Sequence, residues 1–200
     1  MGKTGVKTAV FGFTLNFALF LIKLFVSISS GSLAIYCDGI NNLGDTLSCI
    51  IALIGFILAI KLNERKNSRA QALASFVIGL ILAVTGGYFA YNGVERFLYP
   101  VQISYSFKYA ILIAVTVIVK LIMGIVYLSV NKKHPSPVYK ALITDSFLDC
   151  VVTACTLMSL TLSVKINFAI DGIISVIIGI AVAVSAIKSI IEQSKYLIND

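Results

Sequence analysis

Residues 32–61 read SLAIYCDGINNLGDTLSCIIALIGFILAIK, an almost unbroken apolar stretch that would extend about 45 Å as a helix. A helix needs only about 20 such residues to cross a bilayer. Asn41 and Asp45 lie near the middle of the stretch at i,i+4 spacing, which places both on one helix face. Carboxylates are costly at membrane depth, and those that persist there generally serve a function. The stretch therefore predicts a membrane-spanning helix with a functional polar face.

A second apolar stretch, at residues 138–162, repeats this pattern. It carries Asp145 and Asp149, again four residues apart and again near the middle. Because the two helices are expected to run in opposite directions, the two polar faces can meet at the same depth. If they do, the four side chains form one compact cluster near the membrane midplane, where transporter sites commonly lie.

The composition predicts an all-α integral membrane protein. Of the 200 residues, 58% are hydrophobic and 12% are charged, about half the charge of an ordinary soluble domain. We expect a six-transmembrane-helix bundle in a single domain covering residues 1–200, with a tight turn at residues 29–31 and Ser32 as an N-cap. The expected helices span about residues 5–28, 32–61, 70–97, 106–130, 138–162 and 168–191. A polar, basic loop at residues 62–69 separates the second helix from the third, and no cleavable signal peptide is evident.

The basic residues indicate the orientation of the bundle. The net charge is +7, but the charges gather in alternate loops, as in membrane proteins, and do not suggest nucleic-acid binding. Of the 16 Lys and Arg residues, most flank the helix ends on one side, and Arg96, Lys108 and Lys165 lie at the opposite ends. The positive-inside rule then predicts that both termini are cytoplasmic.

The four side chains of the polar cluster are all oxygen ligands. Such ligands suit Mn²⁺, Mg²⁺ and Ca²⁺, whereas imidazole and thiolate favour Zn²⁺ and Cu. Three neighbouring carboxylates would repel one another, so at least one is expected to hold a proton that a metal would displace. Proton-for-metal exchange is therefore a natural expectation. The alternative is that these residues only hydrogen-bond the helices together, which two matched pairs at one depth make the weaker interpretation.

Other polar residues in the apolar segments have structural explanations. Lys23 and Lys120 each need a counter-charge, and a partnership with an acidic residue is the expected one. Asp38 shares the face of Asn41 and is expected either to line an outer access path or to pair with Lys or Arg. Asp171 is expected to form an interfacial ion pair. His134 lies in a loop and is expected to be solvated.

Small residues are repeated along two of the expected helices. Small residues recur at spacings of mostly three to four, which predicts close helix packing within the bundle more than a subunit interface. They are Gly86, Gly87, Ala90 and Gly93 in one helix, and Gly172, Ser175, Gly179 and Ala183 in another.

The cysteines lack a CxxC pair and are expected to be buried structural thiols, with soft-metal ligation a minor alternative. They are Cys37, Cys49, Cys150 and Cys155.

Two motifs resemble signatures of a known family. Residues 30–45, SGSLAIYCDGINNLGD, and residues 141–149, ALITDSFLD, are similar to the second-helix and fifth-helix signatures of the cation diffusion facilitator (CDF) family. The resemblance implies six helices, a usually homodimeric assembly and metal efflux in exchange for protons. Asn41, Asp45, Asp145 and Asp149 correspond to the family's transport-site ligands. Asn41 in place of the His or Asp of zinc transporters resembles the manganese-exporting branch.

The sequence departs from the family pattern at two places. The loop at residues 62–69 lacks the usual His- and Gly-rich stretch, which makes a second metal site there doubtful. Members of the family usually carry a cytoplasmic metal-sensing domain after the sixth helix, and this chain ends at Asp200. The resemblance is therefore to the transmembrane domain alone, with the C-terminal domain expected to be absent.

The sequence thus predicts a transporter and not an enzyme. Its expected activity is Mn²⁺ efflux by proton-coupled alternating access, in the plasma membrane of a prokaryote. The expected partners are the divalent metal, protons, the lipid bilayer and a second copy of the chain, with no bound cofactor. The nearest alternative is Zn²⁺, Fe²⁺ or Co²⁺ efflux by the same mechanism. Alternatives of other classes are an intramembrane aspartyl protease and a non-transporting assembly subunit.

Overall fold

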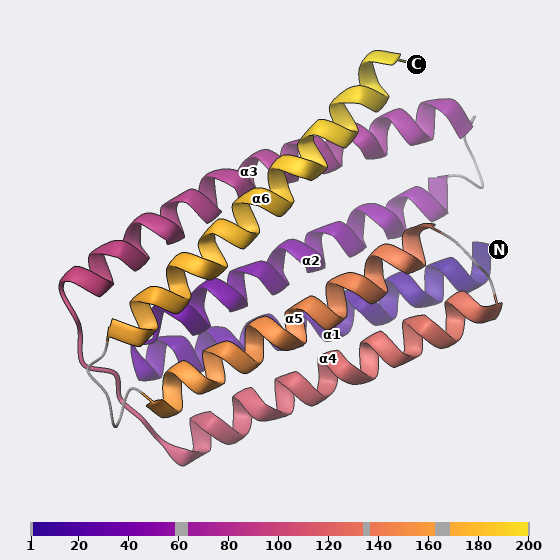
Figure 1. The fold of residues 1–200 in the computed structure, drawn as a ribbon. Coiled ribbons are helices and arrows are strands. Elements are labelled where there is room, and N and C mark those ends of the chain that lie inside the picture. Colours follow the sequence, from indigo (N-terminus) through magenta and orange to yellow (C-terminus); the bar gives the residue numbers. More distant parts are fainter. Residues whose placement is uncertain (1, 59–63, 134–136, 163–168, 200) are drawn as a thin grey trace.

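The computed structural model describes residues 2–58, 64–133, 137–162 and 169–199, and within these ranges it contains six helices and no strand. The helices are α1 (Gly2–Ser30), α2 (Leu33–Leu58), α3 (Glu64–Leu98), α4 (Phe107–Lys133), α5 (Pro137–Leu162) and α6 (Ala169–Asn199). Successive helices run in opposite directions, so both chain termini lie at one end of the bundle (Figure 1). This arrangement confirms the predicted all-α six-helix bundle.

Several helices are longer than predicted, and α3 and α6 exceed their predicted bounds most. Helix α3 begins at Glu64 instead of near residue 70, so most of the expected polar loop is helical. Its first residues, Glu64, Arg65 and Lys66, have high helix propensities, and polarity alone does not end a helix that extends beyond the bilayer. Helix α6 continues to Asn199 for a similar reason. Residues 59–61, predicted as the end of the second helix, and His134 lie outside the described residues.

The surface of the bundle is apolar, as a lipid-facing surface must be. Ile28, Val84 and Phe107 are 73%, 74% and 71% exposed, and exposed apolar area on this scale is typical of membrane contact. By length and composition, five helices can cross a membrane: α1, α3, α4, α5 and α6. Helix α2 lies alongside the other helices along the bundle (Figure 1).

The turn between α1 and α2 is built from the expected residues. Gly31 adopts a φ of 74°, which glycine tolerates best, and its N–H donates to the Ser27 carbonyl over 2.8 Å. Ser32 is the N-cap of α2, because its Oγ accepts from the Ile35 N–H at 3.3 Å. Among the described residues, none forms the predicted ion pair with Asp171. Its carboxylate instead accepts from the Ser32 hydroxyl at 2.6 Å and from the Leu33 N–H at 2.9 Å, satisfying the free donors at the start of α2.

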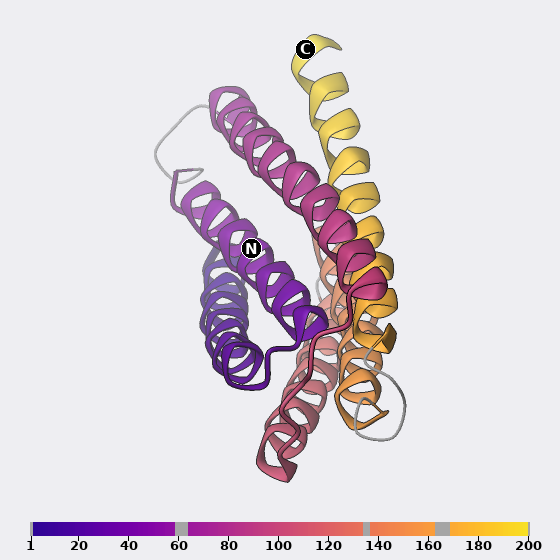
Figure 2. The ribbon, with the colours of Figure 1, turned by 90° about the vertical axis from the view of Figure 1, so that its left-hand side faces the viewer.

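Helices α3 and α6 pack backbone against backbone through their glycines. A Cβ atom placed on Gly86, Gly93, Gly172 or Gly179 would lie 2.5–2.7 Å from a backbone nitrogen of the facing helix. No side chain larger than hydrogen fits at that separation. The prediction that these small residues serve packing within the bundle is therefore confirmed for these four. Gly87 differs, because a Cβ there would meet nothing within 4 Å. Figure 2 shows α3 and α6 side by side at one end of the pair and diverging toward the end that holds the C-terminus.

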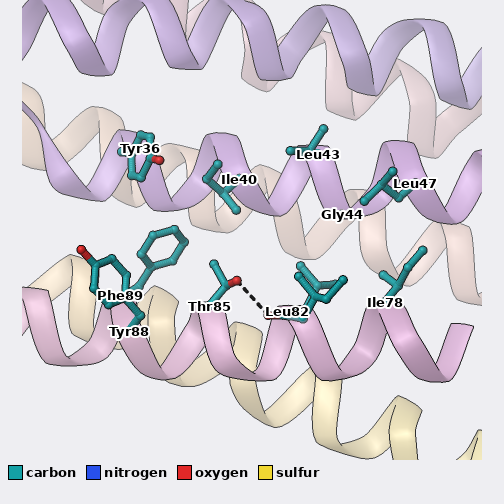
Figure 3. A pocket seen from close by; sticks show the side chains of 11 residues that line it. Tyr36, Ile40, Leu43, Gly44, Leu47, Ile78, Leu82, Thr85, Tyr88 and Phe89 are labelled. Carbon is teal, nitrogen blue, oxygen red and sulfur yellow. Dashed lines mark hydrogen bonds between the residues drawn. The ribbon is translucent and has the colours of Figure 1, made fainter.

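The contact between α2 and α3 is looser. An apolar groove of about 280 Å³ lies between the two helices (Figure 3). Tyr36 and Ile40 of α2 line it from one side, and Leu82 and Phe89 of α3 line it from the other. The Thr85 hydroxyl at its edge donates to the Ile81 carbonyl of its own helix and offers the groove little polarity. The groove therefore lacks the chemistry of a cation site.

Candidate metal site

Helices α2 and α5 bring the two predicted polar pairs together. The carboxylates of Asp45, Asp145 and Asp149 each offer an oxygen that lies within 4.8 Å of the other two. Asn41 joins the group, because its Nδ2 donates to Asp149 Oδ1 over 2.9 Å. The i,i+4 spacing on each helix explains the convergence, since each pair forms one short polar face and the two faces oppose each other. The side chains of all four predicted residues thus form one cluster.

Lys120 of α4 is also part of this group, and its role there is not apparent from the motifs. Its side chain is 0% exposed, and its Nζ lies 3.0 Å from Asp45 Oδ2 and in direct contact with Asp149 Oδ2. The expectation that Lys120 pairs with an acidic residue is confirmed, but the partners are two of the predicted metal ligands. The signal in the sequence is a lysine in the middle of an apolar helix, which requires a buried anion.

The electrostatics of the group favour an added cation. Two carboxylates at such separations repel by about 3–4 kcal/mol at an effective dielectric constant of about 20. Three ionised carboxylates and one ammonium leave a net charge of −2 if no proton is bound. A divalent cation, bound protons or both can balance this charge. The oxygen donors suit hard cations, and no sulfur or imidazole belongs to the acidic group among the residues described.

The exposure of the polar side chains changes along α5. Asp145, Asp149, Thr153 and Thr156 follow one another along a single stripe of α5. Asp149, Thr153 and Thr156 are buried, whereas Asp145 is exposed. Asp145 lies nearer the start of α5, toward the end of the bundle that holds both chain termini (Figure 1). The polar stripe is therefore exposed at Asp145 and buried from Asp149 onward.

A buried ion pair fills the opposite half of the stripe. Lys23 Nζ lies 2.8 Å from Asp38 Oδ1, and both side chains are 0% exposed. The same ammonium donates to Thr153 Oγ1 at 2.9 Å, and the Thr156 hydroxyl donates to Asp38 Oδ2 at 3.4 Å. Of the two expectations for Asp38, the partnership with a basic residue is the one observed. The pair ties α1, α2 and α5 together on the side away from Asp145.

The cysteines lie outside the acidic group. All four are free, and Cys37, Cys49 and Cys150 are buried. Cys150 Sγ donates to the Val117 carbonyl at 3.6 Å, and Cys49 Sγ accepts from Asn16 Nδ2 at 4.0 Å. These contacts fit the expected structural role of buried thiols, but the expectation of burial is wrong for Cys155, which is only partly buried.

Comparison with known proteins gives the family context of this site. Residues 9–198 match the sequence family of the cation efflux transmembrane domain. An uncharacterized transporter of Methanocaldococcus jannaschii is 30% identical, in an alignment covering 91% of this chain and 66% of that protein. A cadmium, cobalt and zinc/H(+)-K(+) antiporter of Bacillus velezensis is 27% identical over 52% of this chain and 34% of its own length. The chain thus spans less than two thirds of either relative.

Proposed function

The chain belongs to the cation efflux family, the cation diffusion facilitators, whose members are multi-pass membrane transporters and not enzymes; from this premise we propose that it carries divalent metal cations across a membrane. The observation that carries the proposal is the convergence of Asn41, Asp45, Asp145 and Asp149 from two helices, with the carboxylate oxygens within 4.8 Å of one another. Family membership argues against the intramembrane protease.

Mn²⁺ is the substrate that the donor set supports best. Carboxylate and amide oxygens are hard ligands, and manganese binds such ligands readily, whereas sites for zinc commonly include imidazole or thiolate. The second candidate is Zn²⁺, Co²⁺ or another metal by the same mechanism. The printed name of the Bacillus velezensis relative, which specifies cadmium, cobalt and zinc, favours that candidate. Competition between metals at one purified site distinguishes the two.

The proposed direction is export from the cytoplasm. The basic residues indicate that the end of the bundle holding both termini faces the cytoplasm, and Asp145 is exposed toward that end. A metal would meet Asp145 first and then reach Asp45 and Asp149. Release to the far side requires the buried region around Lys23 and Asp38 to open, in an alternating-access cycle about a fixed site. The host membrane we propose is a prokaryotic plasma membrane.

Proton exchange follows from the crowding of the carboxylates. Protons and a metal compete for the same oxygens, so metal binding releases whatever protons the group holds. Asp45, Asp145 and Asp149 are the residues proposed to carry these protons. Isothermal titration in buffers of different ionisation enthalpy measures the number released on Mn²⁺ binding. A count of zero between pH 6 and pH 8 would contradict coupling at this site.

The decisive experiment is flux in proteoliposomes. The purified chain is reconstituted, a pH gradient is imposed, and Mn²⁺ and Zn²⁺ uptake are followed with an enclosed indicator. Gradient-driven Mn²⁺ flux that disappears in Asp149→Ala supports the transporter and its site together. Intact protein with no flux of either metal would favour the non-transporting assembly subunit. The same vesicles, crosslinked before solubilisation, test the proposed homodimer.

A further inference from the structure

The ammonium of Lys120 occupies the position of a cation in the candidate site. It contacts Asp45 Oδ2 and Asp149 Oδ2, which belong to two different helices and to two of the proposed ligands. It reaches them from α4, a helix that carries none of those ligands. The side chain is fully buried, so these carboxylates are the anions that offset the cost of burying its charge.

Asp149 uses both of its oxygens in this arrangement. Oδ2 contacts Lys120, while Oδ1 accepts from Asn41 Nδ2 at 2.9 Å. Asn41 therefore presents an amide N–H to the group, whereas metal ligation would need its carbonyl oxygen. A metal that takes the place of the ammonium at Asp149 Oδ2 and binds the carbonyl oxygen of Asn41 requires that Lys120 withdraws and that the amide of Asn41 turns. Both changes are local, and both belong to one binding event.

We propose that Lys120 is a resident cation of the transport site, which the transported metal must displace and which excludes monovalent ions. The proposal rests on the proposed function of the same site and adds a determinant of affinity and charge selectivity to it. Replacing one ammonium by Na⁺ or K⁺ adds no positive charge to the acidic group. Replacing it by a divalent cation adds one. Lys120 stays charged throughout, so the gain in positive charge depends only on the incoming ion. The exchange is therefore favourable for divalent ions, and for monovalent ions it brings no electrostatic gain.

The resident cation also limits how tightly a metal is held. The ammonium of Lys120 is tethered next to the site, so its effective concentration there is high. It therefore competes with a bound divalent ion for the same carboxylate oxygens. Displacement thus weakens metal binding and speeds metal release. Without the ammonium, the same oxygens should hold the metal more tightly and release it more slowly.

Lys120→Met tests the proposal, since methionine keeps an unbranched apolar side chain and removes the charge. Titration of the purified full chain with MnCl₂ is expected to give a Kd lower by about tenfold or more than wild type. Added NaCl, at ionic strength held constant with choline chloride, is expected to compete with Mn²⁺ in the variant and not in wild type. In proteoliposomes, both KM and kcat for Mn²⁺ are expected to fall. Lys108→Met, an exposed lysine on the same helix, is the matched control and should behave as wild type.

Lys120→Arg and Lys120→Gln complete the test. Arginine keeps the charge, so the arginine variant should bind Mn²⁺ no more tightly than wild type. Glutamine supplies a second neutral variant. A neutral variant that folds only with Mn²⁺ present also supports the proposal, because the metal then replaces the missing charge. Unchanged or weaker Mn²⁺ binding in a folded neutral variant would overturn it, as would neutral variants that fail to fold with or without metal. Absence of metal binding in wild type as well would overturn the proposed function itself.

Discussion

Asn41 of α2 and Asp149 of α5 are joined side chain to side chain across 2.9 Å, and this bond links the two halves of the candidate site. The two residues come from motifs more than 100 positions apart, and each has a second polar residue one helical turn away on its own helix. The bond thus fixes the rotation of α2 relative to α5. It also places the amide that we expect to influence metal choice directly beside a carboxylate.

Asp149→Ala is expected to reduce Mn²⁺ flux to the background of empty vesicles, because the variant loses a ligand shared with Asn41 and Lys120. Mn²⁺ uptake under a pH gradient measures the effect, and size-exclusion chromatography in detergent checks that the variant folds. Glu192→Gln, an exposed acidic residue on α6, is the control and should transport normally. Flux at the wild-type rate in Asp149→Ala would refute the site.

Asn41→His is expected to raise Zn²⁺ transport relative to Mn²⁺, because imidazole is a better ligand for zinc than an amide oxygen. A change of roughly tenfold in the ratio corresponds to about 1.4 kcal/mol of differential binding. Initial rates for the two metals in the same vesicles give the ratio. The control is Asn92→His, at a half-buried asparagine of α3 whose Nδ2 donates to the Tyr88 carbonyl of its own helix. An unchanged ratio would remove Asn41 from the proposed selectivity determinants.

Lys23→Met is expected to destabilise the bundle by about 3–5 kcal/mol, since it leaves Asp38 buried without its counter-charge. The double variant Lys23→Met with Asp38→Leu should lose much less, because it buries no unpaired charge. Thermal unfolding in detergent, followed by circular dichroism, compares the three proteins. Equal losses in the single and double variants would show that the pair contributes through packing and not through charge.

Gly179→Ala is expected to lower the thermal stability by about 1–3 kcal/mol, the usual cost of overpacking. Its Cβ would lie 2.5 Å from the Ala90 nitrogen, and a backbone atom in a helix cannot move aside as a side chain can. Gly87→Ala is the matched control on α3. It should be neutral or stabilising by up to about 1 kcal/mol, since alanine favours the helix and meets nothing there. Similar melting temperatures for both variants would contradict the close backbone contact.

The hydrophobic stretches and the two polar pairs predict six helices and the meeting of Asn41 and Asp45 with Asp149, because spacing along a helix determines which residues share a face. The pairing of Lys120 was not predictable in the same way. A lysine in an apolar helix indicates that a buried anion lies nearby. Which anion it contacts depends on how α4 is rotated against α2 and α5. The bond from Asp171 to the start of α2 likewise depends on a tertiary contact between residues far apart in the sequence.

The start of α3 shows a different limit of sequence reasoning. A run of charged residues after an apolar stretch predicts a loop, because charge marks the place where a chain leaves the bilayer. Leaving the bilayer and ending a helix are separate events, however. The residues from Glu64 onward favour a helix in water, so the helix extends past the membrane boundary.

The groove between α2 and α3 makes one face of α2 suited to shear. Both walls are apolar, so a small slide of α2 along α3 would exchange one set of dispersion contacts in the groove for another. The glycine contacts hold α3 and α6 too close for such a slide. Because α2 carries Asn41 and Asp45 on its other side, a displacement of α2 moves these two residues relative to Asp149. The apolar contact between α2 and α3 thus allows small movements of the half of the candidate metal site that α2 carries.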